Sequence, residues 1–384
     1  MEAYFDNSAT TKVEESVKDI MVKTMMEDYG NPSSLHMRGV EAEQYVKKAR
    51  EIIASTLKCQ EKEIYFTSGG TESNNMALIG VAMANKRRGN HIITTSVEHP
   101  SVSMPLKYLE DNGFEITRLP VDGTGRISPE DFKNAIKDTT IMASVMYVNN
   151  EVGAIEPIDE IADIIKRSGR DIIFHVDAIQ AYGKMKIYPK RQGIDLLSVS
   201  GHKVHGPKGI GFIYIKDKIK VNPIIFGGGQ QKGMRSGTEN VPGIAGLGEA
   251  CRIAYKDIDE KAAAMTEIKD YFIDRVNEID GVKVNSAKGS EGAPHIASVS
   301  FEGIRSEVLL HSLEDKNIYV SAGSACSSNK KSVSSTLKSM GIEEKYLDST
   351  VRFSFSSYST KEEVDYTIET IKSLAAMLRL YKHS

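Results

Sequence analysis

Short runs of apolar and β-branched residues alternate with helix-length segments over the first two thirds of the chain. The runs are nearly continuous in apolar residues, which is typical of strands in a sheet that is covered on both faces. The pattern predicts strands at 64–67, 91–95, 115–119, 141–148, 172–176, 196–200 and 211–215. Helices are predicted between several of them, at 71–86, 101–112, 129–136 and 157–168. This alternation indicates an α/β fold with a mostly parallel sheet flanked by helices.

The spacing of the elements changes after about residue 252. A long charged helix is predicted over 257–279, and shorter strands follow at 283–285, 296–301, 320–321 and 351–354. Thr360 and Glu363 have the spacing of a capping box and begin a last helix that runs to about residue 382. We therefore predict a large α/β domain over 13–255 and a smaller α+β domain formed by 1–12 and 256–384.

Composition and charge exclude several classes of protein. The chain has 384 residues and a net charge of −3, so it lacks the basic surplus that is usual in nucleic-acid-binding proteins. Its three cysteines, Cys59, Cys251 and Cys326, are too scattered for a disulfide framework. The sequence contains no C-x-x-C pair, so we expect no cysteine-based zinc site. No signal peptide and no membrane-spanning stretch is visible. We expect a cytoplasmic enzyme that binds neither metal, nucleic acid nor membrane.

The strongest chemical signal surrounds Lys203. The strand predicted at 196–200 ends in Ser200, and Gly201, His202 and Lys203 follow before a glycine-rich turn. Ligands of open α/β sheets bind at the carboxyl ends of the strands. A lysine held there is a candidate for a covalent bond to an aldehyde cofactor. Because a lone loop lysine is more usually solvated, the interpretation depends on the neighbouring motifs.

Asp177 follows the strand predicted at 172–176, and Gln180 lies three residues further on. A buried carboxylate at a strand end suits a pyridinium nitrogen, and a nearby amide suits a phenolic oxygen. The alternative is that Asp177 merely caps a helix.

Two further segments complete the pattern. Ser68-Gly-Gly-Thr71 joins the strand at 64–67 to a helix, where glycines and free amide groups favour a small phosphate; a plain tight turn is the alternative. It does not match the nucleoside-triphosphate-binding pattern. His99 precedes Pro100 at another helix start, where an imidazole suits stacking on a cofactor ring and proton transfer, unless it is structural.

These features lie in order along the chain, each at or just beyond a predicted strand end. The pattern resembles fold-type I pyridoxal-phosphate enzymes of the class V aminotransferase group, and specifically the cysteine desulfurases. The resemblance covers nearly the whole chain. The segments that carry it are 4–11, 30–34, 67–75, 98–99, 149–153, 175–180, 200–209, 227–240 and 323–328.

The resemblance implies how pyridoxal 5'-phosphate is bound. It implies that Lys203 holds the cofactor covalently, that Asp177 pairs with the ring nitrogen, and that Gln180 meets the ring hydroxyl oxygen. It further implies that His99 stacks on the ring. The phosphate would be held by Gly70, Thr71, Ser200 and His202, and by Thr238 of the neighbouring subunit. The protein would therefore be a homodimer.

The resemblance also implies a substrate side. Asn150 would lie beside the cofactor and the substrate, and Arg352 would bind the carboxylate of L-cysteine. Two positions depart from the family. Ser8 stands where alanine is usual, and Ser356 stands where glycine is common.

Cys326 lies in a segment rich in glycine and serine that two lysines follow. This composition predicts a mobile surface loop over about 321–333, and nearby positive charge favours a thiolate. We expect Cys326 to be the nucleophile. Cys59 and Cys251 lie among apolar neighbours in predicted helices, so we expect both to be buried.

The predicted reaction converts L-cysteine to L-alanine and leaves a persulfide on Cys326, with Lys203 or His99 moving the α-proton. The sulfur acceptor stays open between an iron–sulfur scaffold, a tRNA-thiolating enzyme and a thiamine-pathway carrier. A selenocysteine lyase, an aminotransferase or another class V enzyme is the alternative activity. A sulfur carrier or cluster scaffold with a vestigial cofactor site is an alternative of a different class.

Overall fold

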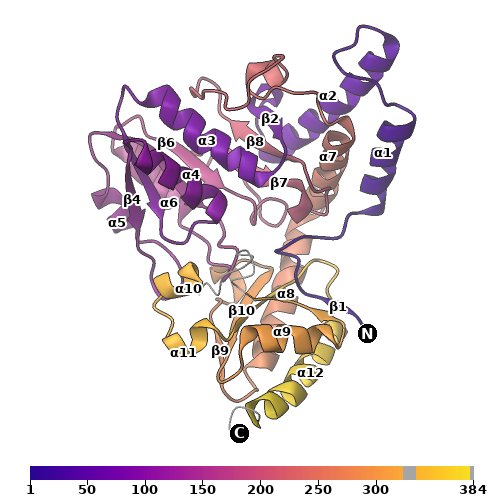
Figure 1. The fold of residues 1–384 in the computed structure, drawn as a ribbon, viewed down its shortest axis with the longest axis vertical. Coiled ribbons are helices and arrows are strands. Elements are labelled where there is room, and N and C mark those ends of the chain that lie inside the picture. Colours follow the sequence, from indigo (N-terminus) through magenta and orange to yellow (C-terminus); the bar gives the residue numbers. More distant parts are fainter. Residues whose placement is uncertain (323–333, 381–384) are drawn as a thin grey trace.

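The computed structural model describes residues 1–322 and 334–380. Its upper part in Figure 1 contains a seven-stranded sheet in the order β2-β8-β7-β6-β5-β3-β4. All strands but β8 run in one direction, because β8 alone pairs antiparallel with both of its neighbours, β2 and β7. The strands are β2 (Ile64–Thr67), β3 (His91–Thr95), β4 (Glu115–Leu119), β5 (Thr140–Met146), β6 (Ile173–Asp177), β7 (Leu196–Ser200) and β8 (Gly211–Ile215). The predicted α/β fold with a mostly parallel sheet is confirmed.

Helices cover both faces of this sheet. They are α1 (Glu15–Met26), α2 (Met37–Leu57), α3 (Gly70–Asn85), α4 (Pro100–Asp111), α5 (Pro129–Asn134), α6 (Ile158–Arg167) and α7 (Val241–Tyr255). Successive strand residues face opposite sides. Ile92 and Ile173 therefore pack with α3 and α4, whereas Ile93 and Phe174 pack with α2, α5, α6 and α7. This two-sided burial explains why the strand sequences are continuous in apolar residues.

The lower part is built on a four-stranded antiparallel sheet in the order β12-β13-β10-β9. A two-stranded sheet joins β1 to β11, so the first residues of the chain pack here. The elements are β1 (Ala3–Tyr4), α8 (Ile258–Val276), β9 (Val282–Val284), β10 (Ile296–Phe301), α9 (Ser306–Glu314), β11 (Ile318–Tyr319), β12 (Ser321–Ala322), α10 (Ser335–Ser339), α11 (Glu344–Leu347), β13 (Thr350–Ser354) and α12 (Lys361–Leu380). The domain boundaries proposed from the sequence stay a prediction.

Several predicted element boundaries need correction. The strand expected at 141–148 ends at Met146, and the one expected at 320–321 is replaced by β11 and β12 on either side of Val320. The capping box of α12 is confirmed, because Thr360 N donates to Glu363 Oε2 (2.8 Å) and Glu363 N donates to Thr360 Oγ1 (3.2 Å). Helices α1, α9, α10 and α11 were not predicted, and α2 and α7 were predicted only as helical segments near Cys59 and Cys251, without bounds.

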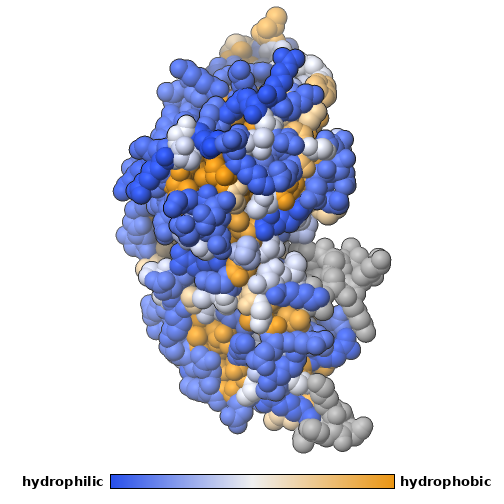
Figure 2. Space-filling view, turned by 90° about the vertical axis from the view of Figure 1, so that its left-hand side faces the viewer, coloured by the Kyte–Doolittle hydropathy of each residue, from blue (hydrophilic) through white to orange (hydrophobic). Residues whose placement is uncertain are grey.

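The described residues also form four 3₁₀ helices: η1 (Glu61–Glu63), η2 (Gly201–Lys203), η3 (Gln231–Gly233) and η4 (Gly289–Glu291). Among the described helices, none is long and apolar enough to cross a membrane. Seen from the side, hydrophilic residues cover most of the surface, and apolar patches lie in both halves of the molecule (Figure 2).

Candidate active site

A cavity of about 390 Å³ lies where the carboxyl ends of the parallel strands meet β12 and β13. Strand ends collect polar side chains here because the loops that follow parallel strands share one edge of the sheet. The cavity is lined by ten of the predicted site residues: Gly70, Thr71, His99, Asn150, Asp177, Gln180, Ser200, His202, Lys203 and Arg352. Of the other two, Thr238 is exposed outside this cavity, and Cys326 lies outside the described residues.

Lys203 ends η2, the short helix that follows β7 directly. Its Nζ donates to the main-chain carbonyl oxygens of Ser8 (2.5 Å) and Ala9 (2.7 Å). The N-terminal segment, more than 190 residues away in sequence, therefore closes one side of the cavity around this lysine.

A second lysine, Lys184, forms a hydrogen bond to the main chain of Lys203. It is 6% exposed, and its Nζ donates to the main-chain carbonyl oxygen of Lys203 (2.8 Å). Burial, and then the charge of Lys203, lower the pKa of Lys184 to about 7. Lys184 could not be selected from the sequence, because nothing near it indicates a contact with a main-chain atom 19 residues away.

Asp177 is buried at the end of β6. Its Oδ1 accepts from Ile179 N (3.0 Å) and its Oδ2 accepts from Asn74 Nδ2 (2.8 Å). Burial raises the pKa of Asp177, and these two hydrogen bonds oppose the rise by stabilising the carboxylate. A cation close to this carboxylate would keep it ionised. The protonated ring nitrogen of a pyridinium is such a cation.

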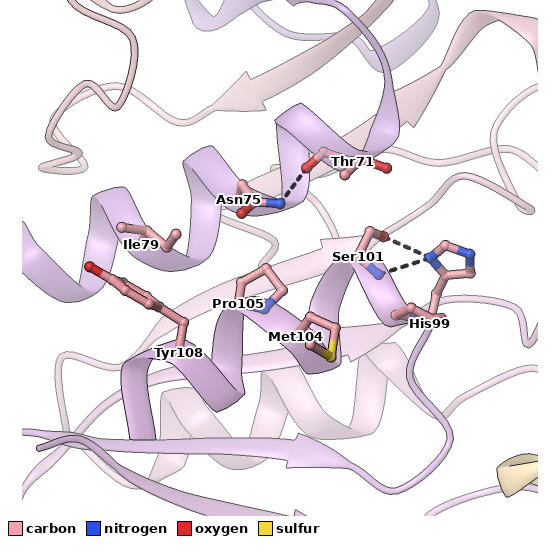
Figure 3. Close-up of a pocket in the computed structure, with 9 residues that line it drawn as sticks. Thr71, Asn75, Ile79, His99, Ser101, Met104, Pro105 and Tyr108 are labelled. Carbon is pink, nitrogen blue, oxygen red and sulfur yellow. Dashed lines mark hydrogen bonds between the residues drawn. The ribbon is translucent and has the colours of Figure 1, made fainter. Parts of the chain in front are cut away.

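His99 is the N-cap residue of α4, as Pro100 at the helix start predicted. Ser101 N donates to His99 Nδ1 (3.1 Å), and Ser101 Oγ lies 2.8 Å from the same atom (Figure 3). Since Nδ1 accepts, the ring hydrogen is on Nε2. Burial lowers the pKa of His99, and the charge of Asp177 opposes this, so the ring is neutral at neutral pH.

Asn74 and Ser101, neither of which was predicted as a site residue, link Asp177 to His99. Asn74 is fully buried, and its Nδ2 donates both to Asp177 Oδ2 and to Ser101 Oγ (2.9 Å). The hydroxyl of Ser101 is thereby left to donate to His99 Nδ1. Asn74 lies one helical turn after Gly70 on α3, and this i, i+4 spacing is the signal that would have selected it.

The turn before α3 has the geometry of an anion cradle. Gly69 has φ of +150°, and α3 begins at Gly70, where the amide groups of the first helical turn point out of the helix. A Cβ on Gly70 would lie 2.1 Å from Ile179 Cδ1, and a Cβ on Gly211 would lie 2.8 Å from Gly69 Cα. The turn can therefore pack this closely against Ile179 and β8 only because these positions are glycine, and this packing places the start of α3 at the cavity wall.

Replacing Gly70 with alanine is expected to weaken cofactor binding without unfolding the chain. Alanine favours a helix over glycine, but its Cβ would push the side chain of Ile179 into the cavity. We expect the dissociation constant for pyridoxal phosphate to rise about tenfold, as an overpacking cost of roughly 1.4 kcal/mol implies. Titration of cofactor absorbance measures it. Gly123→Ala, where nothing lies within 4 Å of the added Cβ, is the matched control; equal affinities would contradict the cradle.

Arg352 lies in the middle of β13 and is 7% exposed. Its Nη1 donates to the carbonyl oxygen of Asn150 (2.8 Å), and its Nη2 pairs with Asp6 Oδ1 (2.9 Å). Its Nε is buried and has no partner among the described residues. Burial raises the pKa of Asp6, and the guanidinium of Arg352 opposes the rise. Asp6 was not predicted as a site residue. It forms an ion pair with Arg352, the arginine that is predicted to bind the substrate carboxylate.

The two family departures have different settings. Ser8 lines the cavity, and its buried Oγ has no partner within the described part of the chain. Ser356 instead lines a smaller cavity of about 40 Å³ behind Lys203, together with Lys184 and His205. The expectation for the cysteines is only half confirmed. Cys251 is buried, whereas Cys59 lies just after α2 ends and is partly exposed, so that prediction was wrong.

Comparison with known proteins defines the class. The model of the class-V aminotransferase family matches residues 3–367, so the chain belongs to this family. Within it, the cysteine desulfurase IscS of Methanosarcina thermophila is 43% identical over 376 residues, covering 98% of this chain and 92% of that protein. The solved structure of a NifS-like protein superimposes with a TM-score of 0.93 at 37% identity, over 98% of this chain and 100% of that one. The structure of SspA in complex with cysteine gives 0.82 at 35%, over 93% and 100%. The family resemblance is confirmed.

The family makes the protein a pyridoxal-phosphate-dependent enzyme, and the cavity fits that cofactor. A buried carboxylate, a lysine and a glycine cradle at the start of a 16-residue helix lie around one space. The buried Ser8 Oγ and Arg352 Nε also lack partners within the described residues, and both side chains line this space. The buried carboxylate suits a charged ring nitrogen, the glycine cradle suits a phosphate, and the unpartnered Arg352 Nε suits a carboxylate.

Proposed function

We propose that the protein is a cysteine desulfurase that converts L-cysteine to L-alanine and takes up the sulfur as a persulfide on Cys326. The observation that carries this is the convergence of Lys203, the buried Asp177 and Arg352 on one cavity. The relatives named cysteine desulfurase, and the structural neighbour SspA in complex with cysteine, support the choice of substrate.

The chain's residues divide the binding of the cofactor between them. Lys203 holds it covalently, Asp177 pairs with the ring nitrogen, and His99 stacks on the ring. Gln180 meets the ring hydroxyl oxygen. The phosphate is held by Gly70, Thr71, Ser200 and His202, with Thr238 from the partner subunit. When bound, pyridoxal phosphate withdraws electrons from the α-carbon of the amino acid.

Substrate binding and proton transfer use the remaining groups. Arg352 binds the carboxylate of L-cysteine through its Nε edge, beside Asn150, whose carbonyl oxygen holds the guanidinium in place. Lys203 or the neutral His99 removes the α-proton and returns a proton to the carbon product. The carbonyl oxygens of Ser8 and Ala9 keep Lys203 at the cavity wall.

The thiolate of Cys326 attacks the sulfur of the substrate. An S–S bond forms and the C–S bond breaks, and the electron pair of the C–S bond stays with the three-carbon product. That product takes up a proton and leaves as alanine, so a thiol and L-cysteine give alanine and a persulfide with atoms and electrons in balance. We further propose that the persulfide passes to an acceptor protein of iron–sulfur or thiolation chemistry.

The reaction class is tested by product analysis with L-cysteine. We expect alanine to accumulate with an equal amount of persulfide or sulfide, and no keto acid to form. A keto acid formed from the substrate would identify an aminotransferase or an eliminating enzyme and would contradict the proposal. Steady-state rates with L-selenocysteine distinguish a desulfurase from a selenocysteine lyase.

A groove beside the cavity supports a homodimer. It has a volume of about 580 Å³ and lies between α3 and α4, where Met104 and Tyr108 are 64% and 54% exposed (Figure 3). The groove shares Thr71, His99 and Ser101 with the cofactor cavity. A second copy seated in it would cover this apolar surface and bring its own Thr238 toward the phosphate.

A charge in the groove is expected to separate the subunits. Tyr108→Glu would require a carboxylate to be desolvated at the proposed interface, a cost of several kcal/mol. We expect the variant to elute as a monomer and to lose most of its bound cofactor. Met377→Glu changes a 45%-exposed methionine on α12 and is the matched control, expected to stay dimeric. Light scattering after gel filtration gives the mass; a fully active wild-type monomer would refute the dimer.

A further inference from the structure

His295 has no role in the function proposed above. It does not line the cofactor cavity, but it contacts Gln180, which does. It precedes β10 and is fully buried. Its Nε2 lies 3.3 Å from Oε1 of Gln180, which belongs to the segment after β6. The main-chain carbonyl oxygen of His295 accepts from Phe355 N (2.8 Å), so the residue is fixed to the small sheet.

The two contacts of Gln180 determine which way its side-chain amide faces. Its Nε2 donates to the carbonyl oxygen of Ser8 (3.0 Å), and its Oε1 faces His295. The reverse orientation would set Oε1 against the Ser8 carbonyl oxygen, where both atoms can only accept. One N–H of Gln180 is therefore bound to Ser8, and the second remains for the cavity that Gln180 lines.

The same contacts determine the state of His295. Because Oε1 of Gln180 can only accept, Nε2 of His295 must carry the ring hydrogen. Nδ1 is then a bare acceptor, and it has no partner among the described residues. Burial, with the charges of Lys184, Lys269, Arg352 and Lys203 around it, lowers the pKa of His295 well below its usual value. The ring is thus a neutral donor with a single hydrogen to give.

We propose that His295 is a positioning residue that locks the amide of Gln180 so that an N–H, and never the amide oxygen, faces the bound cofactor. This inference rests on the proposed function, in which Gln180 meets the ring hydroxyl oxygen. A donor at that point stabilises the oxygen as an anion. Without His295, Oε1 of Gln180 is a buried acceptor with no partner. This orientation of the amide is then less stable, and rotation of the amide costs less.

The hydrogen bond from His295 to Gln180 is expected to affect the pH at which the cofactor-bound nitrogen of Lys203 loses its proton, which packing alone does not change. An anionic ring oxygen attracts the proton on the cofactor-bound nitrogen of Lys203, and a donor to that oxygen weakens the attraction. Loss of the donor therefore raises the pH at which that nitrogen loses its proton. We expect His295→Leu to raise the pH midpoint of the bound cofactor's absorbance change by about 0.5 to 1 pH unit, the equivalent of one hydrogen bond.

Three further variants test whether His295 affects the pH midpoint through Gln180. His295→Asn keeps an amide donor and is expected to have a midpoint closer to that of the parent. In the Gln180→Ala background, His295→Leu should add no further shift, because the two residues act in series. His91 is also fully buried, but it bonds to Thr140 and Thr117 away from the cavity. His91→Asn should therefore leave the midpoint unchanged.

A parent midpoint in His295→Leu, or a shift that persists with Gln180→Ala, would overturn the inference. A parent protein that takes up no pyridoxal phosphate would instead refute the proposed function. Nitrogen-15 NMR of the cofactor-free protein provides a second test that does not depend on the leucine variant folding. The His295 signal, identified by its loss in His295→Asn, should show hydrogen on Nε2. Hydrogen on Nδ1 would contradict the lock.

Discussion

Lys203→Ala is expected to abolish desulfuration. The substitution removes both the covalent attachment of the cofactor and a group that moves the α-proton. Loss of these two roles should lower the rate by at least about 10³-fold. Gly70, Asp177 and His99 stay in place, so weaker, non-covalent uptake of the cofactor should persist. Alanine release from L-cysteine and the visible absorbance of the bound cofactor measure the two effects separately.

Lys208→Ala is the matched control, because Lys208 lies in the same turn and is exposed outside the cavity. It should keep the parent rate. Borohydride reduction followed by peptide mapping locates the attachment directly. We expect the label on Lys203, and a label on Lys208 or on no lysine would refute the assignment.

Cys326→Ala is expected to separate the two halves of the reaction. Binding of L-cysteine needs Lys203, Asp177 and Arg352, whereas removal of sulfur needs the thiol. The variant should keep its cofactor and show the spectral change of substrate binding, but release almost no alanine. The sequence predicts a surface loop for this residue, so the free energy of unfolding should change by no more than about 0.5 kcal/mol.

Cys59→Ala is the control for this variant. Cys59 is a partly exposed thiol after α2 that does not line the cavity, and burial raises its pKa to about 12. A thiol that stays protonated is a poor nucleophile, so we expect the parent rate of alanine release. If Cys326→Ala also released alanine at the parent rate, Cys326 would not be the nucleophile.

The sheet could be predicted from the sequence because its strands are buried on both faces and are therefore continuous in apolar residues. Helix α7 could be predicted only as a helical segment without bounds. It contains Gly243, Gly246 and Gly248, which argue against a helix by propensity. A Cβ on Gly246 would lie 2.8 Å from Met21 Cγ, and one on Gly248 would lie 2.7 Å from Ala49 Cβ. The glycines therefore let α1 and α2 pack closely against α7, which is a tertiary requirement that local sequence does not reveal.

The candidate site shows the same division. Asp177, Lys203 and the turn at Gly70 could be predicted because each follows a strand whose end is visible in the sequence. Asp6 and Lys184 could not, because their roles depend on contacts with Arg352 and with the main chain of Lys203. Such contacts join distant segments and involve residue types that are ordinary on a surface.

A single-turnover experiment tests the central claim most directly. The holoenzyme is mixed with L-cysteine in the absence of reductant, and free alanine and persulfide-labelled peptides are measured in the same sample. We predict that alanine and a persulfide on Cys326 appear in equal amounts. Alanine with no persulfide on Cys326, or a persulfide on Cys59 or Cys251 instead, would contradict the account.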